Sequence, residues 1–130
     1  MRIIEVKTQA KEEFIDLTHV IKKEIASSQI KNGICLVFVP HTTAGVTINE
    51  NADPTVKEDF LMALKKLIPD SLPYQHSEGN SPAHIKASIV GSSVHLLIEN
   101  GQLSLGTWQG VFFCEFDGPR RRKVFINFSS

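Results

Sequence analysis

Hydrophobic and polar positions alternate over several short stretches, which indicates β-strands. Arg2 to Thr8 has the alternation of a half-buried edge strand, and Ile34–Val39 is an apolar run that predicts a buried strand ending at Pro40. Shorter patterns predict strands at residues 46–49, 93–99, 111–116 and 123–128. Asn100-Gly101 joins two such stretches and predicts a two-residue hairpin turn with positive φ at both residues.

Apolar residues at a spacing of three and four predict helices in three other segments. These helices are expected to begin at Asp16, Asp53-Pro54 and Ser81-Pro82 and to end near Asn32-Gly33, Pro69 and Gly91, because those residues cap or terminate helices. Strands mostly joined by hairpins, together with three helices, predict the α+β class. We expect a single domain over residues 1–130, with an antiparallel β-sandwich-like core and the helices packed on it.

The charge balance excludes some classes of function. The 130 residues carry 14 basic and 14 acidic side chains, whereas a nucleic-acid-binding domain is usually basic. No apolar run approaches the roughly 20 residues that span a bilayer, and the N-terminus lacks the apolar core of a signal peptide. We therefore expect a cytoplasmic protein that binds neither membrane nor nucleic acid. Zero net charge also favours an oligomer, which hides part of the surface.

The cysteines and histidines are the first candidates for chemistry. Cys35 and Cys114 lie in apolar strand-like runs and are interpreted as small core residues, with metal ligation or nucleophilic catalysis as the alternative. The histidines fall into two groups. His19 and His95, on a predicted helix and a predicted strand, are interpreted as structural; the others, at the boundaries of loops rich in small and polar residues, are candidates for binding: His41, His76 and His84.

His84 has the most informative surroundings. If Ser81 caps its helix, His84 is the third helical residue, next to free backbone N–H groups that can bind an anion. The positive end of the helix dipole favours the neutral, ligand-competent imidazole there. His76 precedes it across a glycine-containing loop, and His41 could complete a three-imidazole site for a divalent ion. Zinc suits such a set, as do nickel, cobalt and copper.

Three further segments allow a structural and a functional interpretation. Thr42 and Thr43 could either form a turn or offer hydroxyls to an anion, although the segment lacks the lysine and glycines of a P-loop. Residues 120–123 (RRRK) form a charged run that is either a solvated strand edge or a source of one or two arginines for an anionic ligand, Glu115 and Asp117 neutralising the others. Trp108 is either a core residue or a stacking platform, with Gln109 reading the edge of a flat ring.

Several blocks, in order along essentially the whole chain, resemble the YjbQ family of small bacterial and archaeal proteins. They are PHTTAG at residues 40–45, NENAD at 49–53, His76 with EGN at 78–80, AHIK at 83–86, LGTWQG at 105–110 and EFDGPR at 115–120. The resemblance implies an α+β fold built around a β-sandwich and assembled as a homotrimer. It also implies pockets at or near subunit contacts, lined by the histidines and the Gln–Trp segment.

The resemblance further implies a weak thiamine-phosphate synthase activity, a transferase reaction that joins a pyrimidine pyrophosphate to a thiazole phosphate. In that reaction Arg120 and an ion on His41, His76 and His84 would offset the charge of the departing pyrophosphate. Glu50 or Glu78 would take a proton or orient an imidazole. The substrate would be held by the remaining candidates: Thr42, Thr43, Asn80, Trp108 and Gln109.

Two other functions remain open. A non-catalytic trimer that captures a phosphorylated or carboxylated small molecule needs the anion site and an arginine but no proton-transfer group. Binding of nucleic acid through residues 120–123 conflicts with the neutral charge and with the absence of aromatic residues from the run.

Overall fold

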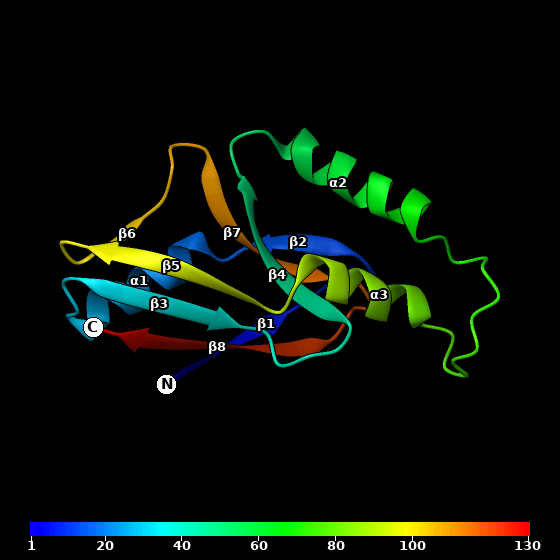
Figure 1. Ribbon diagram of the computed structural model, residues 1–130, viewed down its shortest axis with the longest axis horizontal. Coiled ribbons are helices and arrows are strands. Elements are labelled where there is room, and N and C mark those ends of the chain that lie inside the picture. Colours follow the sequence, from blue (N-terminus) through cyan, green and yellow to red (C-terminus); the bar gives the residue numbers. More distant parts are fainter.

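A computed structural model describes all of residues 1–130 (Figure 1). The strands are β1 (Arg2–Lys7), β2 (Glu13–Asp16), β3 (Gly33–Phe38), β4 (Ala44–Glu50), β5 (Ser93–Glu99), β6 (Gln102–Ser104), β7 (Gln109–Glu115) and β8 (Arg121–Ser129). The helices are α1 (Thr18–Ser28), α2 (Pro54–Leu67) and α3 (Ser81–Val90). The predicted α+β class with an antiparallel sandwich and three helices is confirmed.

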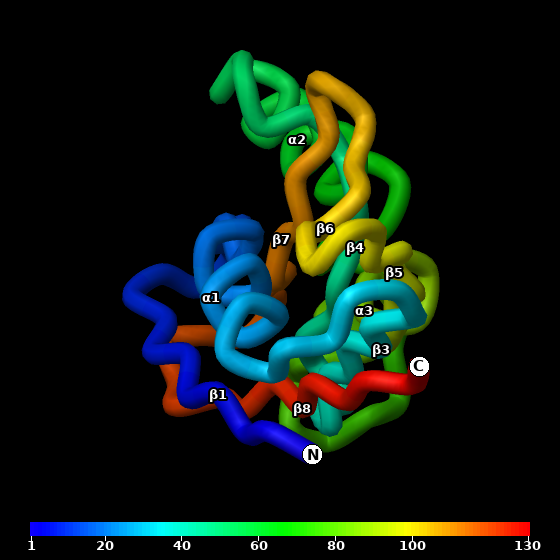
Figure 2. The backbone as a smooth tube through the Cα atoms, turned by 90° about the vertical axis from the view of Figure 1, so that its left-hand side faces the viewer, coloured from blue at the N-terminus to red at the C-terminus, as the bar shows by residue number.

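The strands form two antiparallel sheets. One has the order β1-β8-β3-β5-β6, with the predicted edge strand β1 at its margin, and the other has the order β2-β7-β4. In Figure 1, β4 and β7 rise steeply away from the direction of β3, β5 and β8, so the sheets diverge at one end. Figure 2 shows the same separation from the side, with α2 and the β6–β7 loop far from both termini. At the other end of the strands the sheets come together.

The three-stranded sheet is covered on both faces, and its central strand β7 is accordingly buried along almost its whole length. One face packs against the five-stranded sheet, against Ile21 and Ile25 of α1 and against Leu17 at the cap of that helix. The other face packs against α2 and α3 through a smaller cluster: Phe14, Leu64, Ala83, Ala87, Phe112, Cys114 and Phe116. This double burial explains why β7 is a continuous hydrophobic run instead of an alternating one.

Three caps and turns that the sequence predicts from neighbouring residues are present in the structure. Asp53 accepts a hydrogen bond from the Thr55 amide and caps α2, with Pro54 beside it as predicted. Asn100 and Gly101 both have positive φ, 51° and 77°, in the β5–β6 turn. The end of α3 at Gly91 is also confirmed.

The first helical segment differs from the prediction at both ends. Residues Glu13–Asp16 form strand β2, so Leu17 takes the cap position, while Asp16 still accepts a hydrogen bond from the Thr18 amide. The helix ends at Ser28, where Gln29 is left-handed, and not at Asn32-Gly33. Gly33 instead begins β3, where a Cβ atom would lie 2.3 Å from the Ser129 carbonyl oxygen. The glycine is needed for a close approach between strands and not to terminate the helix.

No helix of this chain is both long enough and apolar enough to cross a membrane.

Candidate functional site

The largest cavity lies where the two sheets come together, beside the first turn of α3. It has a volume of about 660 Å³, within the usual range for small-molecule sites, and only two of its thirteen lining residues are hydrophobic. Eight of the eleven predicted site residues line it: His41, Thr42, Thr43, His76, Glu78, Asn80, His84 and Arg120. We call this cavity the pocket.

Three predicted residues lie elsewhere. Glu50 and Gln109 face each other at one end of the β4–β7 ladder, whereas Ala44 and Glu115 face each other at the other end, next to the pocket. Six residue steps along a strand separate the ends by roughly 20 Å. Trp108 is 63% exposed and is therefore not a core residue. Glu50, Trp108 and Gln109 thus do not share the pocket with the histidines of the same chain.

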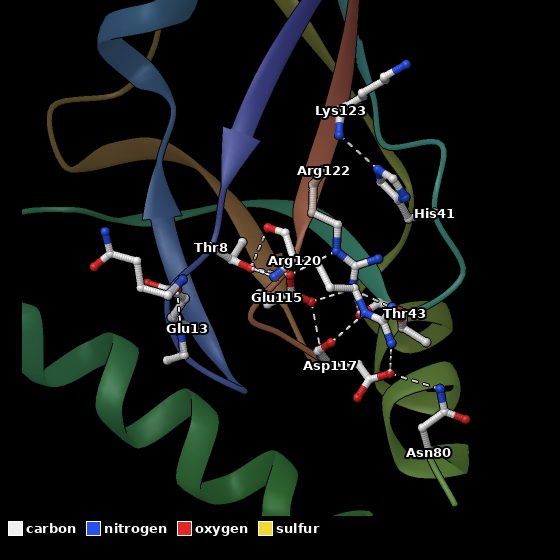
Figure 3. Close-up of polar contacts among 12 residues, drawn as sticks. Thr8, Glu13, His41, Thr43, Asn80, Glu115, Asp117, Arg120, Arg122 and Lys123 are labelled. Carbon is white, nitrogen blue, oxygen red and sulfur yellow. Dashed lines mark hydrogen bonds and ion pairs between the residues drawn. The ribbon is translucent and has the colours of Figure 1, made fainter. Parts of the chain in front are cut away.

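The three loop histidines line the pocket in two different ways. His76 and His84 face each other, with ring centroids 5.2 Å apart and planes at 82°. Two imidazoles that share a tetrahedral zinc ion at about 2 Å have centroids roughly 5 Å apart, so this pair fits two ligands of one ion. The Nε2 atom of His41 instead accepts a hydrogen bond from the Lys123 amide at 2.9 Å (Figure 3).

The third imidazole therefore does not fit the expected three-histidine metal site. With Nε2 accepting a hydrogen bond, neutral His41 carries its proton on Nδ1 and has no free lone pair for a metal ion. No three His, Cys, Asp or Glu side chains are arranged to hold one ion. Partial burial and the positive charge of Arg122 lower the pKa of His41, which favours this neutral form.

The surroundings of His84 also differ from the prediction. Asn80, not Ser81, occupies the cap position, so His84 is the fourth helical residue. Its amide is directed at the Asn80 carbonyl oxygen, 3.4 Å away, and is not free for an anion. The Asn80 side chain does not cap the helix: its Nδ2 donates to Asp117 at 2.9 Å, and its Oδ1, which a cap would use as the acceptor, has no partner.

Two arginines line the pocket, and each is paired with a carboxylate (Figure 3). Arg120, whose side chain is 52% exposed, donates from Nη2 to Asp117 at 3.0 Å. Arg122 is buried and pairs with Glu115, which is completely buried. Burial alternates from Arg121, the first residue of β8, so the end of the charged run enters a strand with successive side chains on opposite faces, as predicted.

The carboxylates remain ionised although both are shielded from solvent to some extent. Burial raises the pKa of Glu115, but hydrogen bonds from Arg122, the Asp117 amide and Thr8 outweigh this effect and hold its pKa below the ordinary value. For Asp117 the hydrogen bonds from Asn80 and Arg120 likewise outweigh burial and lower the pKa. Both arginines are therefore electrically compensated at neutral pH.

The cysteines take no part in the site. Cys35 and Cys114 are free and fully buried, as predicted for small core residues. Burial raises the pKa of the Cys35 thiol to about 11 and that of Cys114 further still. Neither sulfur is a thiolate at neutral pH, which excludes the nucleophilic alternative.

Comparison with known proteins agrees with the fold and with the order of the sequence blocks. The sequence model of the family described as "UPF0047 protein YjbQ-like" matches residues 2–130. This chain belongs to the YjbQ (UPF0047) family.

Two relatives are similar over most of their length. The YjbQ-family protein MJ1081 of Methanocaldococcus jannaschii is 53% identical over 94% of this chain and 88% of its own, and YugU of Bacillus subtilis is 47% identical over 97% and 96%. A crystal structure of a YjbQ-family protein from Clostridium acetobutylicum is 53% identical and superposes with a TM-score of 0.97, covering 99% of this chain and 100% of the other. A YbjQ-like protein of unknown function from Sulfolobus solfataricus is 35% identical, with a TM-score of 0.94 and coverages of 98% and 94%.

Sequence reasoning named Glu115 and the arginine run of this YjbQ-family chain as compensating charges, but it missed Thr8 and did not single out Arg122 as the buried partner of Glu115. Thr8, Glu115 and Arg122 form a buried hydrogen-bonded group with Thr43, although they come from four separate parts of the chain. The available signal was a glutamate inside the apolar run at residues 111–116, since a charge in a buried strand requires a partner. Lys86 gives a similar signal: it is 3% exposed and pairs with Glu12 at 2.7 Å.

Proposed function

We propose that the pocket binds a phosphorylated small molecule. The observation that carries this proposal is the meeting of imidazole, hydroxyl and guanidinium donors from distant segments in one polar cavity of about 660 Å³. Phosphate oxygens accept hydrogen bonds from all three kinds of donor. Because Asp117 and Glu115 compensate the arginines, hydrogen bonding contributes more to affinity here than net positive charge does.

We further propose that the protein acts as a transferase on such a ligand, the thiamine-phosphate synthase reaction implied by the resemblance being the activity to test. There the bond between the pyrimidine's methylene carbon and pyrophosphate breaks as the bond to the thiazole forms. The donors of the pocket would stabilise the charge that develops on the departing pyrophosphate. Glu78 lines the pocket and is the candidate carboxylate that could orient an imidazole there. Glu50 of the same chain lies outside the pocket.

The test measures binding of pyrophosphate and of a thiazole phosphate by calorimetry, and turnover with a pyrimidine pyrophosphate. We expect His84→Ala to lose both, and His19→Ala, at an exposed position on α1, to lose neither. Glu78→Gln separates the two functions, because it leaves binding intact and reduces turnover only if the protein is an enzyme. Binding without turnover in the wild type favours the non-catalytic binding module, unchanged turnover in Glu78→Gln excludes a catalytic role for Glu78, and a wild-type protein that binds neither compound refutes the proposal.

A divalent ion, zinc in the first instance, is the cofactor we propose for His76 and His84. The distance and angle between their rings support two ligands, and bound zinc would supply a Lewis acid beside the phosphate. Elemental analysis after zinc loading should give metal in the wild type and in His19→Ala but none in His84→Ala. Equal metal in both variants, or none in the wild type, refutes the cofactor without affecting the phosphate site.

We also propose a homotrimer in which neighbouring copies complete each pocket. The separation of Glu50, Trp108 and Gln109 from the histidines supports this, because only another copy could bring them together. The uncovered face of the five-stranded sheet also carries exposed apolar side chains suited to a contact. Its members include Ile3, Ile34, Phe38 and Leu97.

Mixing two inactive variants tests the shared pocket. If His84→Ala and Trp108→Ala each abolish turnover, reassembled mixtures should regain part of it, because some pockets then combine an intact histidine set with an intact Trp108. Light scattering gives the oligomeric state. A monomer, or mixtures as inactive as the separate variants, contradicts the shared pocket.

A further inference from the structure

Arg122 has a hydrogen-bonding capacity that the protein uses only in part. Its Nε donates to Glu115 at 2.9 Å, and its Nη2 donates to the other Glu115 oxygen and to the Thr43 hydroxyl at 2.9 Å. Its Nη1 has no partner among the protein atoms, and in Figure 3 the guanidinium lies between His41 and Thr43 with Nη1 free of dashed lines. One end of the guanidinium is held rigidly while the other remains available.

The free Nη1 group faces the pocket. The Arg122 side chain is only 5% exposed, yet it is part of the pocket lining. Asn80 Oδ1 is the only unpartnered polar side-chain atom that is fully buried. The Nη1 atom of Arg122 also lacks a partner, so it is not fully buried, and the pocket that Arg122 lines gives access to it. A guanidinium amino group in a nearly buried position favours a strong acceptor, because an unfilled donor there costs free energy.

The neighbouring groups identify that acceptor as an oxyanion. His41, whose Nε2 is occupied by the Lys123 amide, can offer only its Nδ1–H when neutral, and Thr42 adds a hydroxyl to the same lining. Arg122, His41 and Thr42 thus bring donor groups to the same part of the pocket lining. Glu115 cancels the charge of Arg122. The ligand group that best matches these donors therefore carries a single or partial negative charge on each of its oxygens.

We propose that Arg122, and not the exposed Arg120, is the principal ligand-binding arginine, and that its Nη1 donates to an oxygen of a phosphate or carboxylate group. Glu115 and Thr43 hold the guanidinium in place for this contact. Arg120 lies at the rim, where solvent screens its charge and Asp117 holds it by two hydrogen bonds. The inference rests on the proposed function in that it treats the pocket as a ligand site, and it identifies the atom that recognises the ligand.

Arginine Nε–H signals of the nitrogen-15-labelled protein test the proposal directly. The Arg122 signal is assigned by its loss in Arg122→Lys, and the protein is then titrated with inorganic phosphate and separately with acetate. We expect phosphate to shift the Arg122 signal at lower concentration than it shifts Arg120, and to leave Arg121 unmoved. Arg121 is a matched control because its side chain is 75% exposed and lies outside the pocket.

Binding measurements complete the test. Arg122→Lys keeps a positive charge for Glu115 but removes Nη1, so phosphate affinity should fall about tenfold or more, while Arg121→Gln should match the wild type. Thermal unfolding without ligand separates this loss from misfolding, and the double variant Glu115→Gln/Arg122→Gln replaces Arg122→Lys if the latter does not fold.

The outcomes separate this inference from the proposed function. A shift of Arg122 with acetate but not with phosphate keeps the oxyanion subsite and refutes a phosphorylated ligand. A shift of Arg120 alone keeps the phosphate proposal and overturns the role of Arg122. No shift with either anion, or wild-type phosphate affinity in Arg122→Lys, overturns the inference.

Discussion

The two ends of the β4–β7 ladder differ in how their side chains are buried and hydrogen-bonded. At the pocket end, where the sheets meet, Glu115 is completely buried and receives hydrogen bonds from Arg122, Thr8 and the Asp117 amide. At the diverging end, Gln109 accepts from the amide of Gly106, three residues earlier, and Trp108 is exposed. The pocket end is therefore held by buried side chains from distant segments, whereas the diverging end is held by the Gly106–Gln109 turn and by a backbone hydrogen bond from the Asn51 amide to the Trp108 carbonyl.

This difference shows what each end can contribute to function. A buried ion pair linked to Thr43 keeps the lining of the pocket in one geometry, which a binding site requires. The Trp108 side chain, which is exposed, can contact another molecule without loss of core packing. The pocket end is thus suited to hold a ligand, and the diverging end is suited to cover one.

The largest effect on stability is expected from a substitution at the pocket end. Glu115→Ala leaves Arg122 buried without its counter-charge, which should lower the free energy of unfolding by about 3–5 kcal/mol. Glu50→Ala, at the other end of the same ladder and only partly buried, should cost less than about 1 kcal/mol. Urea unfolding of both variants measures the difference. Similar losses at both ends would show that the buried pair is not what stabilises the pocket end.

A smaller effect is expected at a turn remote from the pocket. Gly101→Val should cost on the order of 1 kcal/mol or more, because a β-branched residue is strained at a φ of 77°. A Cβ there would meet no atom closer than 3.6 Å, so the cost arises from the backbone and not from a clash. Gly101→Asn is the control, since asparagine tolerates a positive φ. Equal melting temperatures for the valine and asparagine variants would exclude backbone strain.

The smallest effect concerns pH at the pocket end. The pKa of His41 is lowered in the folded protein, so the unfolded chain binds the proton more readily and stability falls as the pH drops below about 6.5, the ordinary value. Protonation also removes the acceptor for the Lys123 amide. This decrease should be smaller in His41→Gln and unchanged in His19→Gln, as measured by unfolding between pH 7 and pH 5. A wild-type curve identical to that of His41→Gln contradicts the role of this hydrogen bond.

The sequence by itself determined the features that depend on neighbouring residues. Helix α2 with its Asp53 cap, the Asn100-Gly101 turn and the buried cysteines follow from local spacing and residue type. The loop histidines, threonines and Asn80 could also be named, because polar residues at loop boundaries are candidates for binding wherever the chain places them. Local conformation and burial leave a periodic signal in sequence.

Only the tertiary structure decided how these residues are combined. It paired Arg122 with Glu115, directed the Asn80 side chain to Asp117 instead of to its helix, and put the ladder between the histidines and Trp108. Sequence spacing alone cannot specify these choices, because they depend on which distant groups come within hydrogen-bonding distance once the sheets pack. A buried charge must find its partner in three dimensions, and the partner that satisfies it is set by the packing of the whole core.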